Sequence, residues 1–209
     1  MDPGFGDGGR LFFAAVPDFD AAAKIHRVAG ILKQAHRFTG KLIPRECLHV
    51  SLLFLGRGSA QLVRSACEAV AGVKMIPFEV SFDRTASFRG RPGNRPFVLM
   101  GDDTLDRLKS LRHRLGAAIA EKGMDQKDMA RRAHRDFAPH VTLLYGDRAV
   151  DEYPVAPIRW TVNEFVLIHS LKGTSTLRVG GSMYDGDSGV REGKSNCPPP
   201  STASRTATP

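Results

Sequence analysis

The segment HVSLLF at residues 49–54 has a close copy in the segment HVTLLY at residues 140–145. The two segments match at six successive positions, each of which is identical or conservatively replaced. A lone histidine with a hydroxyl residue two positions later arises easily by chance, whereas six matching positions indicate an internal duplication. The duplication predicts two similar lobes whose matching strands meet near a pseudo-twofold axis.

Both segments are typical of β-strands, in which successive side chains point to opposite faces. His49 therefore shares a face with Ser51, and His140 shares a face with Thr142. The apolar residues between them can pack on helices. Two imidazoles and two hydroxyls then face a common groove that suits a phosphate group. Strict alternation directs Tyr145 away from His140.

This set of side chains fits the hydrolysis of a phosphodiester. The reaction needs one group that activates water and another that protonates the leaving oxygen, and two histidines with an ordinary pKa of about 6.5 can supply both at neutral pH. The hydroxyls of Ser51 and Thr142 can donate hydrogen bonds to the non-bridging phosphate oxygens, where charge develops. A single strand histidine is more often a surface or core residue, but the duplicated motif favours a catalytic pair.

A metal site is the other reading of paired histidines. A catalytic zinc usually takes three protein ligands, and no carboxylate or cysteine pattern accompanies His49 and His140. We therefore expect neither a metal nor a cofactor.

The rest of the sequence predicts interspersed strands and helices, several of them joined by short turns, which favours an α+β fold with two mixed or antiparallel sheets flanked by helices around a central groove. Ser59 can cap one helix, and Asp102 or Asp103 can begin another that ends at Gly123. We expect residues 1–184 to form a single bilobal domain and residues 185–209, rich in Gly, Ser, Pro and Thr, to be disordered. The expected strands are residues 10–16, 48–55, 76–88, 96–100, 138–145, 159–170 and 175–180, and the first expected helix is residues 20–36.

Composition limits the class of protein and of partner. The 209 residues carry a formal net charge of +8 at pH 7, which raises affinity for polyanions such as nucleic acids. No apolar run is long enough for a membrane span and no secretory signal is recognised, so we expect a cytoplasmic protein without a membrane partner, and a monomer. The 3 cysteines are widely spaced, so we expect no structural disulfide.

The two motifs resemble those of the 2H phosphoesterase superfamily, which is marked by two His-x-Thr/Ser-x motifs with x hydrophobic. Within it, RLFFA at residues 10–14, CLHVSLLFLG at 47–56 and FAPHVTL at 137–143 are similar to the bacterial RNA 2′,3′-cyclic phosphodiesterases, also called 2′-5′ RNA ligases (LigT-like). The resemblance runs from about residue 10 to about residue 182. It implies a bilobal α+β fold and the metal-independent opening of a terminal 2′,3′-cyclic phosphate to a 2′-phosphate. By the same resemblance His49 is the acid that protonates the leaving 3′ oxygen, and His140 is the base.

The sequence departs from this family at two positions. Ser51 stands where threonine is usual, which keeps the hydroxyl. Tyr145 stands where arginine is common, so a cation that would hold phosphate is absent there, and Tyr145 either stacks on a base or packs in the core. Further RNA contacts are expected from a basic stretch before the second motif, for which a solvated loop is the alternative: Arg131, Arg132 and Arg135.

Three functions therefore stay open. The first is opening of 2′,3′-cyclic phosphate ends of RNA, with weak 2′-5′ ligation as a possible reverse reaction. The second is the same chemistry on a small nucleotide, such as a cyclic phosphate of ADP-ribose or a 2′-5′ oligoadenylate. The third is a catalytically idle module that binds RNA ends, which the missing arginine at Tyr145 favours and the intact histidines oppose.

Overall fold

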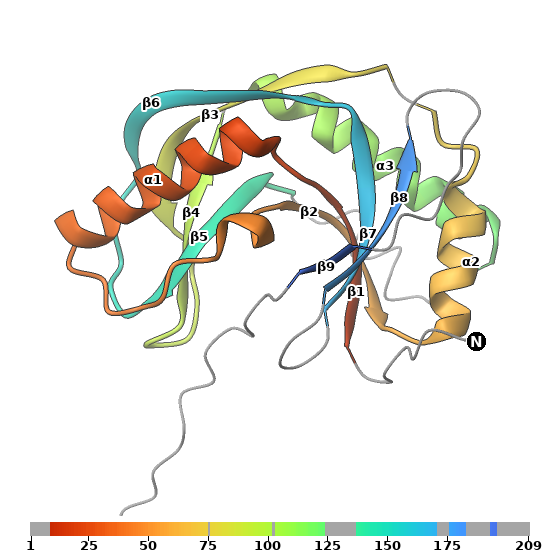
Figure 1. Ribbon diagram of the computed structural model, residues 1–209, viewed down its shortest axis with the longest axis horizontal. Coiled ribbons are helices and arrows are strands. Elements are labelled where there is room, and N and C mark those ends of the chain that lie inside the picture. The colour runs from red at the N-terminus through yellow and green to blue at the C-terminus, as the bar shows by residue number, and fades with distance from the viewer. Residues whose placement is uncertain are drawn as a thin grey trace, which may run out of the picture.

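The computed structural model describes residues 9–74, 76–101, 104–123 and 137–170 in full and the backbone of residues 103, 176–182 and 193–195 (Figure 1). The helices are α1 (Phe19–Ala35), α2 (Ala60–Val70) and α3 (Asp106–Glu121), with short 3-10 helices η1 (Arg45–Cys47) and η2 (Asp103–Leu105). The strands are β1 (Arg10–Ala15), β2 (Val50–Arg57), β3 (Phe78–Ser87), β4 (Arg95–Met100), β5 (His140–Gly146), β6 (Tyr153–Val162), β7 (Glu164–Ser170), β8 (Thr176–Ser182) and β9 (Gly193–Ser195).

Side-chain caps fix where the first two helices begin. The Asp18 carboxylate accepts a hydrogen bond from the Ala21 backbone N–H at 2.8 Å at the start of α1. The Ser59 hydroxyl accepts one from the Leu62 N–H at 3.2 Å at the start of α2, as the sequence predicted. Each cap satisfies a backbone donor that the first helical turn leaves without a partner.

The described strands form one sheet in the order β6-β3-β4-β5-β2-β1-β7-β8-β9, and every neighbouring pair is antiparallel. Strands β2 and β5 are joined by one residue pair, Val50 with Val141, whereas the other pairs share longer ladders. The predicted α+β fold with two sheets is therefore confirmed in class. The two expected sheets are two halves, β6-β3-β4-β5 and β2-β1-β7-β8-β9, that meet at this joint.

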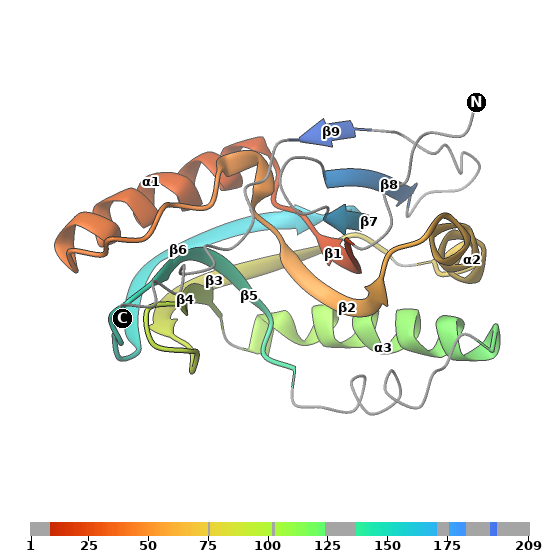
Figure 2. The same ribbon diagram turned by 90° about the horizontal axis from the view of Figure 1, so that it is seen from below.

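The two halves are related by a pseudo-twofold pattern of elements. In one half β1 pairs with β2 and α1 lies between them in sequence; in the other β4 pairs with β5 and α3 lies between them. The helices are exchanged between the halves, because α1 contacts β5 and β6 while α3 contacts β2. Figure 2 shows α1 and α3 on opposite sides of the strands.

The prediction of one strand over residues 159–170 is wrong. The chain forms two strands that separate at Asn163: β6 pairs with β3 in one half, and β7 pairs with β1 in the other. The part of β6 before residue 159 contains Pro154 and Pro157, and proline cannot donate a hydrogen bond to a ladder. They are tolerated because β6 is an edge strand, whose outer N–H groups need no partner. The third helix also begins later than predicted, at Asp106, after the 3-10 turn η2.

The main core occupies one face of the sheet in both halves and receives apolar residues from all three helices. Ile25 of α1, Val63 of α2 and Leu111 of α3 pack there with Val50 and Val141. The opposite face of β1 and β7 carries a separate, small apolar cluster: Ala14, Val166 and Ile168, with Phe12 and Val16 packed against it.

Among the described residues, the buried hydroxyl of Thr85 makes no hydrogen bond. The Thr85 side chain on β3 is fully buried, and its Oγ1 makes no hydrogen bond with any described residue. A buried polar group without a hydrogen bond destabilises a fold by about 1–3 kcal/mol. We therefore expect Thr85→Val, which keeps the shape and removes the hydroxyl, to raise the free energy of unfolding by about 1–3 kcal/mol. Urea denaturation measures this directly, and a lower stability of the variant would contradict the assignment.

The cysteines differ from the sequence prediction. Cys47 is disulfide-bonded, contrary to the expectation of no disulfide, and its partner lies outside the described residues. Spacing in sequence gave no information on which distant cysteines the fold brings together.

The segment 185–209, predicted to be disordered, lies outside the described residues except for the backbone of β9. Over the described part of the chain, no helix combines the length and apolarity needed to cross a membrane.

Candidate active site

The joint between the two halves places both histidine motifs on one face of the sheet. Val50 and Val141 are paired, and both side chains are fully buried in the main core. Because neighbouring residues on a strand point to the opposite face, the residues beside this pair point away from the core. We call this side of the sheet the histidine face. At the joint it carries the four predicted residues His49, Ser51, His140 and Thr142.

The antiparallel register also sets the neighbours within the four. One step from the pair Val50–Val141, His49 lies across from Thr142, and Ser51 lies across from His140. Side chains in directly opposite positions have Cβ atoms about 4.5–5.5 Å apart. Each histidine of one motif is therefore adjacent to the hydroxyl of the other motif. The structure brings together all four residues predicted for the phosphate site.

Both histidines are held in the same way. The Nδ1 atom of His49 lies 2.8 Å from the carbonyl oxygen of Cys47, and the Nδ1 atom of His140 lies 2.8 Å from that of Ala138. A carbonyl oxygen only accepts, so Nδ1 carries a hydrogen in each ring and donates it. The proton that each imidazole gains or loses is then on Nε2.

An aromatic ring from a neighbouring segment contacts each imidazole. The centroid of Phe12 on β1 lies 5.1 Å from that of His49, and the centroid of Phe88, just after β3, lies 4.8 Å from that of His140 in an edge-on arrangement. Neither phenylalanine is among the site residues that the sequence predicted. Their place beside the histidines depends on strand order, which the local sequence does not report.

Burial changes the protonation of one histidine. Loss of solvent lowers the pKa of His140 below its ordinary value, and the hydrogen bond with the Ala138 carbonyl opposes this effect in part. The charged form of an imidazole is the form that burial disfavours. His140 is therefore neutral at pH 7, with Nε2 able to accept a proton.

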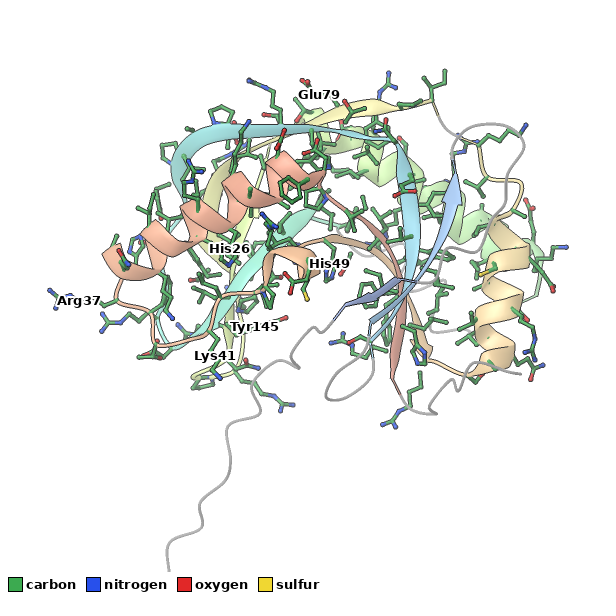
Figure 3. All side chains as sticks on the ribbon, in the orientation of Figure 1. His26, Arg37, Lys41, His49, Glu79 and Tyr145 are labelled. Atoms are coloured by element: carbon green, nitrogen blue, oxygen red, sulfur yellow. The ribbon has the colours of Figure 1, made fainter. Side chains whose placement is uncertain are left out.

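A β-bulge places Tyr145 on the histidine face, so the expectation from strict alternation is wrong. Val98 of β4 pairs with Thr142 while Pro96, two residues earlier on the same face, pairs with Tyr145. Leu143 is the extra residue, and it shifts every later side chain of β5 to the other face. In Figure 3 His49 and Tyr145 both lie below α1.

The same irregularity occurs in the first motif. Ala14 of β1 pairs with Ser51 and Phe12 pairs with Phe54, so the extra residue is Leu52. Phe54 therefore occupies the position in one half that Tyr145 occupies in the other. The duplication extends to this bulge, which brings the last residue of each motif onto the histidine face. In its pairing with β1, β2 has a second extra residue, Leu55, for which the pairing of β5 with β4 shows no counterpart, and it puts Arg57 on the same face as Phe54.

Other predicted contacts lie outside this arrangement. The three arginines expected to contact RNA are outside the described residues: Arg131, Arg132 and Arg135. As for metal binding, the described segments contain no group of three or more His, Cys, Asp or Glu side chains that could hold an ion.

Comparison with known proteins places the chain in a family. A family model described as the 2′-5′ RNA ligase superfamily matches residues 17–174. The chain belongs to the 2′-5′ RNA ligase superfamily. It is 31% identical over 135 residues to an RNA 2′,3′-cyclic phosphodiesterase of Archaeoglobus fulgidus, a match that covers 64% of this chain and 70% of the relative. The chain is thus an enzyme of the 2H phosphoesterase group, as the two motifs predicted.

Several solved structures have a similar fold. E. coli LigT in apo form has a TM-score of 0.61 at 23% sequence identity, over 92% of this chain and 97% of LigT. E. coli LigT complexed with 3′-AMP has a TM-score of 0.62 at 25% identity, over 84% of this chain and 96% of LigT. TT0787 of Thermus thermophilus has a TM-score of 0.58 at 21% identity, over 84% and 95% of the two chains.

Proposed function

We propose that this superfamily member opens 2′,3′-cyclic phosphate ends of RNA to 2′-phosphate ends, with His49 and His140 as the acid and base. The observation that carries the proposal is the paired arrangement at the joint. Two imidazoles with the same Nδ1–carbonyl hydrogen bond lie on one face, each next to a hydroxyl of the other motif. Hydrolysis of a phosphodiester by water requires this set of groups.

In the proposed step, Nε2 of His140 takes a proton from a water molecule as its oxygen attacks phosphorus. The bond between phosphorus and the 3′ oxygen breaks, and His49 donates a proton to that oxygen. The products are a 2′-phosphate and a free 3′-hydroxyl. His140 then loses its proton and His49 regains one from solvent, which restores the starting state.

The lowered pKa of His140 supports its role as the base, because a base must be unprotonated before the reaction. Ser51 and Thr142 are proposed to donate hydrogen bonds to the non-bridging oxygens, where negative charge increases during attack. No metal is part of the proposal, because a catalytic zinc takes three protein ligands and the described residues offer no such group beside the two histidines.

RNA as the substrate is supported by charge and by the relative. The formal net charge is +8, and the relative from A. fulgidus is named for action on RNA 2′,3′-cyclic phosphate. Tyr145, on the histidine face beyond Thr142, is proposed to contact the terminal nucleotide with its ring or hydroxyl. A tyrosine there supplies no positive charge, so the cations that hold the RNA lie elsewhere on this face.

The pH dependence of activity follows from the base. The residue opposite His140 on β4 is Met100, whose neighbour on β3 is Arg84, and the Arg84 charge is countered by Asp83 and Glu152 at 3.2 and 3.3 Å. Burial is thus the main influence on the His140 pKa. We expect kcat/KM to fall tenfold per pH unit on the acidic side, with a midpoint below about 6.5. Rates measured from pH 4.5 to 8 give this midpoint, and a value above 6.5 would contradict the assignment of His140 as base.

The test of the proposed function uses a short RNA that ends in a 2′,3′-cyclic phosphate, incubated with the full chain in excess EDTA. Mass spectrometry detects the addition of one water, and digestion with a 3′-specific phosphatase distinguishes the 2′-phosphate from the 3′-phosphate product. Formation of the 2′-phosphate supports the proposal. Binding of the RNA end without turnover would replace it with the idle binding module, and turnover of a cyclic mononucleotide alone would assign a small-molecule substrate.

A further inference from the structure

A row of polar residues crosses three strands of the histidine face, at the N-terminal end of β1. Arg10 pairs with Arg57 on β2 on one side and with Ser170 on β7 on the other. Directly paired residues project to the same side of a sheet. Arg10 is on the histidine face because it alternates with Phe12 and Ala14, which pack in the small cluster there. We call Arg10, Arg57 and Ser170 the arginine row.

Both arginines of this row are exposed, and no acidic side chain of the described residues pairs with them. Neither Arg10 nor Arg57 forms an ion pair with a carboxylate of the described residues, whereas Arg84 on the same face has both Asp83 and Glu152. Like charges in directly opposite positions of a strand pair destabilise a sheet. A bound anion between two guanidinium groups and a hydroxyl removes this repulsion, since arginine forks match the oxygens of a phosphate.

Arg10 is held in place by an aromatic ring. Its guanidinium carbon lies 5.2 Å from the centroid of Phe54, the residue that the β2 bulge brings onto the histidine face. Phe54 is paired with Phe12, and Phe12 contacts the ring of His49. A continuous surface therefore runs from His49 over two aromatic rings to the arginine row. Nucleobases stack on such rings independently of sequence.

The length of this surface limits what can reach both ends. Ala14, which pairs with Ser51 at the catalytic joint, is four residues along β1 from Arg10 in the row. Four strand residues span about 13 Å. A stacked nucleic-acid strand advances about 3.4 Å per nucleotide, so the row lies about four nucleotides from the joint. A mononucleotide at the histidines cannot reach it.

The corresponding end of the other half has no such row. Pairing between β4 and β5 ends at Arg95 with Gly146, and the next residues in this register are Asn94 and Asp147. In this register the positions of Arg10 and Arg57 are occupied by Asn94 and Asp147, so the directly opposed pair of arginines is not repeated, although Arg95 and Arg148 lie next to these positions.

We propose that the arginine row binds a backbone phosphate of the RNA, several nucleotides to the 5′ side of the cyclic end held by the histidines. This inference rests on the proposed function, and it identifies the natural substrate as an oligonucleotide. The phosphate lies between the guanidinium groups of Arg10 and Arg57, with the Ser170 hydroxyl as a further donor. The row discriminates chain length and takes no part in the chemical step.

The experiment compares wild type with Arg10→Gln/Arg57→Gln on two substrates, a 2′,3′-cyclic mononucleotide and a hexanucleotide with the same cyclic end. We expect kcat/KM for the hexanucleotide to fall about tenfold and that for the mononucleotide to change less than twofold. The charge-matched control is Arg107→Gln/Arg114→Gln, which removes two exposed arginines of α3 on the other face. Equal losses in both double variants would reduce the effect to general attraction and overturn the proposal.

Binding and stability give readouts that do not depend on turnover. Fluorescence anisotropy with a hexanucleotide product measures the slope of log affinity against log salt, which falls by about 0.7 per phosphate contact in single strands. Because the row is proposed to bind one phosphate, we expect a slope smaller by about 0.7 in the arginine-row variant. The unfolding temperature of Arg57→Gln without RNA should rise by up to about 3 °C, because the like-charge pair is removed. A lower unfolding temperature would assign Arg57 a structural role instead.

These outcomes separate the inference from the function on which it rests. Absence of turnover of both substrates by wild type would reject the proposed function, while the anisotropy slopes would still decide whether the row binds RNA. Turnover with an equal loss on the mononucleotide and the hexanucleotide in the arginine-row variant would keep the function and reject the row.

Discussion

Replacement of His140 by alanine is expected to lower kcat for opening of a 2′,3′-cyclic phosphate by about 10²–10⁴-fold, the usual contribution of a positioned acid or base. His49→Ala should cause a loss of the same order. The two losses should not multiply in the double variant, because acid and base act in one step. Rates are measured with the cyclic-phosphate RNA under saturating conditions. His113→Ala is the matched control, since His113 is exposed on α3, away from the histidine face.

The choice of leaving group separates the two histidine roles. An aryl phosphodiester releases an anion that needs no proton, so it should restore much of the rate of His49→Ala and little of that of His140→Ala. Rescue of His140→Ala alone would reverse the assignment of acid and base. Full activity of either single variant on the RNA would remove that histidine from the mechanism.

Removal of the hydroxyls is expected to have the second largest effect. Thr142→Val and Ser51→Ala should each lower kcat by about 10²–10³-fold, because each removes a hydrogen-bond donor aimed at the oxygens on which charge develops. KM should change much less, since the donor acts mainly in the transition state. Thr142→Ser should recover most of the activity, because it keeps the hydroxyl that Ser51 already provides in the first motif.

The control for these variants is Thr85→Val, which makes the same chemical change on the core face of β3. It should leave kcat unchanged while it raises stability. An equal decrease of KM and kcat in Thr142→Val, or no change in either, would show that this hydroxyl does not act on the transition state.

The sequence predicted the catalytic joint because the duplication is visible in two short segments. His49 and His140 are in equivalent positions of matching strands, and alternation alone puts each on the same face as the hydroxyl of its own motif. The apolar residues that alternate with the histidine and hydroxyl residues in each motif also identify the opposite side of the sheet as the core side. Strand order was not needed for this part of the prediction.

The remaining features depend on irregular backbone and on distant pairings. The bulge at Leu143 reverses the face of Tyr145, and nothing in the local sequence distinguishes this leucine from its neighbours. The first half of β6 contains two prolines, and the place of this strand at the sheet edge is decided by its pairing with β3. The contact of Arg10 with Phe54 requires both the pairing of β1 with β2 and the bulge at Leu52. Each is a consequence of register, which a single sequence does not encode locally.

The exchange of helices has a consequence for how the chain can be divided. The strands of each half are covered by a helix whose neighbours in sequence belong to the other half, as α1 and α3 illustrate. A fragment cut between β4 and α3 would separate β2 from its cover and leave α1 without β5 and β6. We infer that residues 1–184, for all their internal repetition, form one cooperative unit, and that neither motif could persist as an independent half-protein with a single histidine.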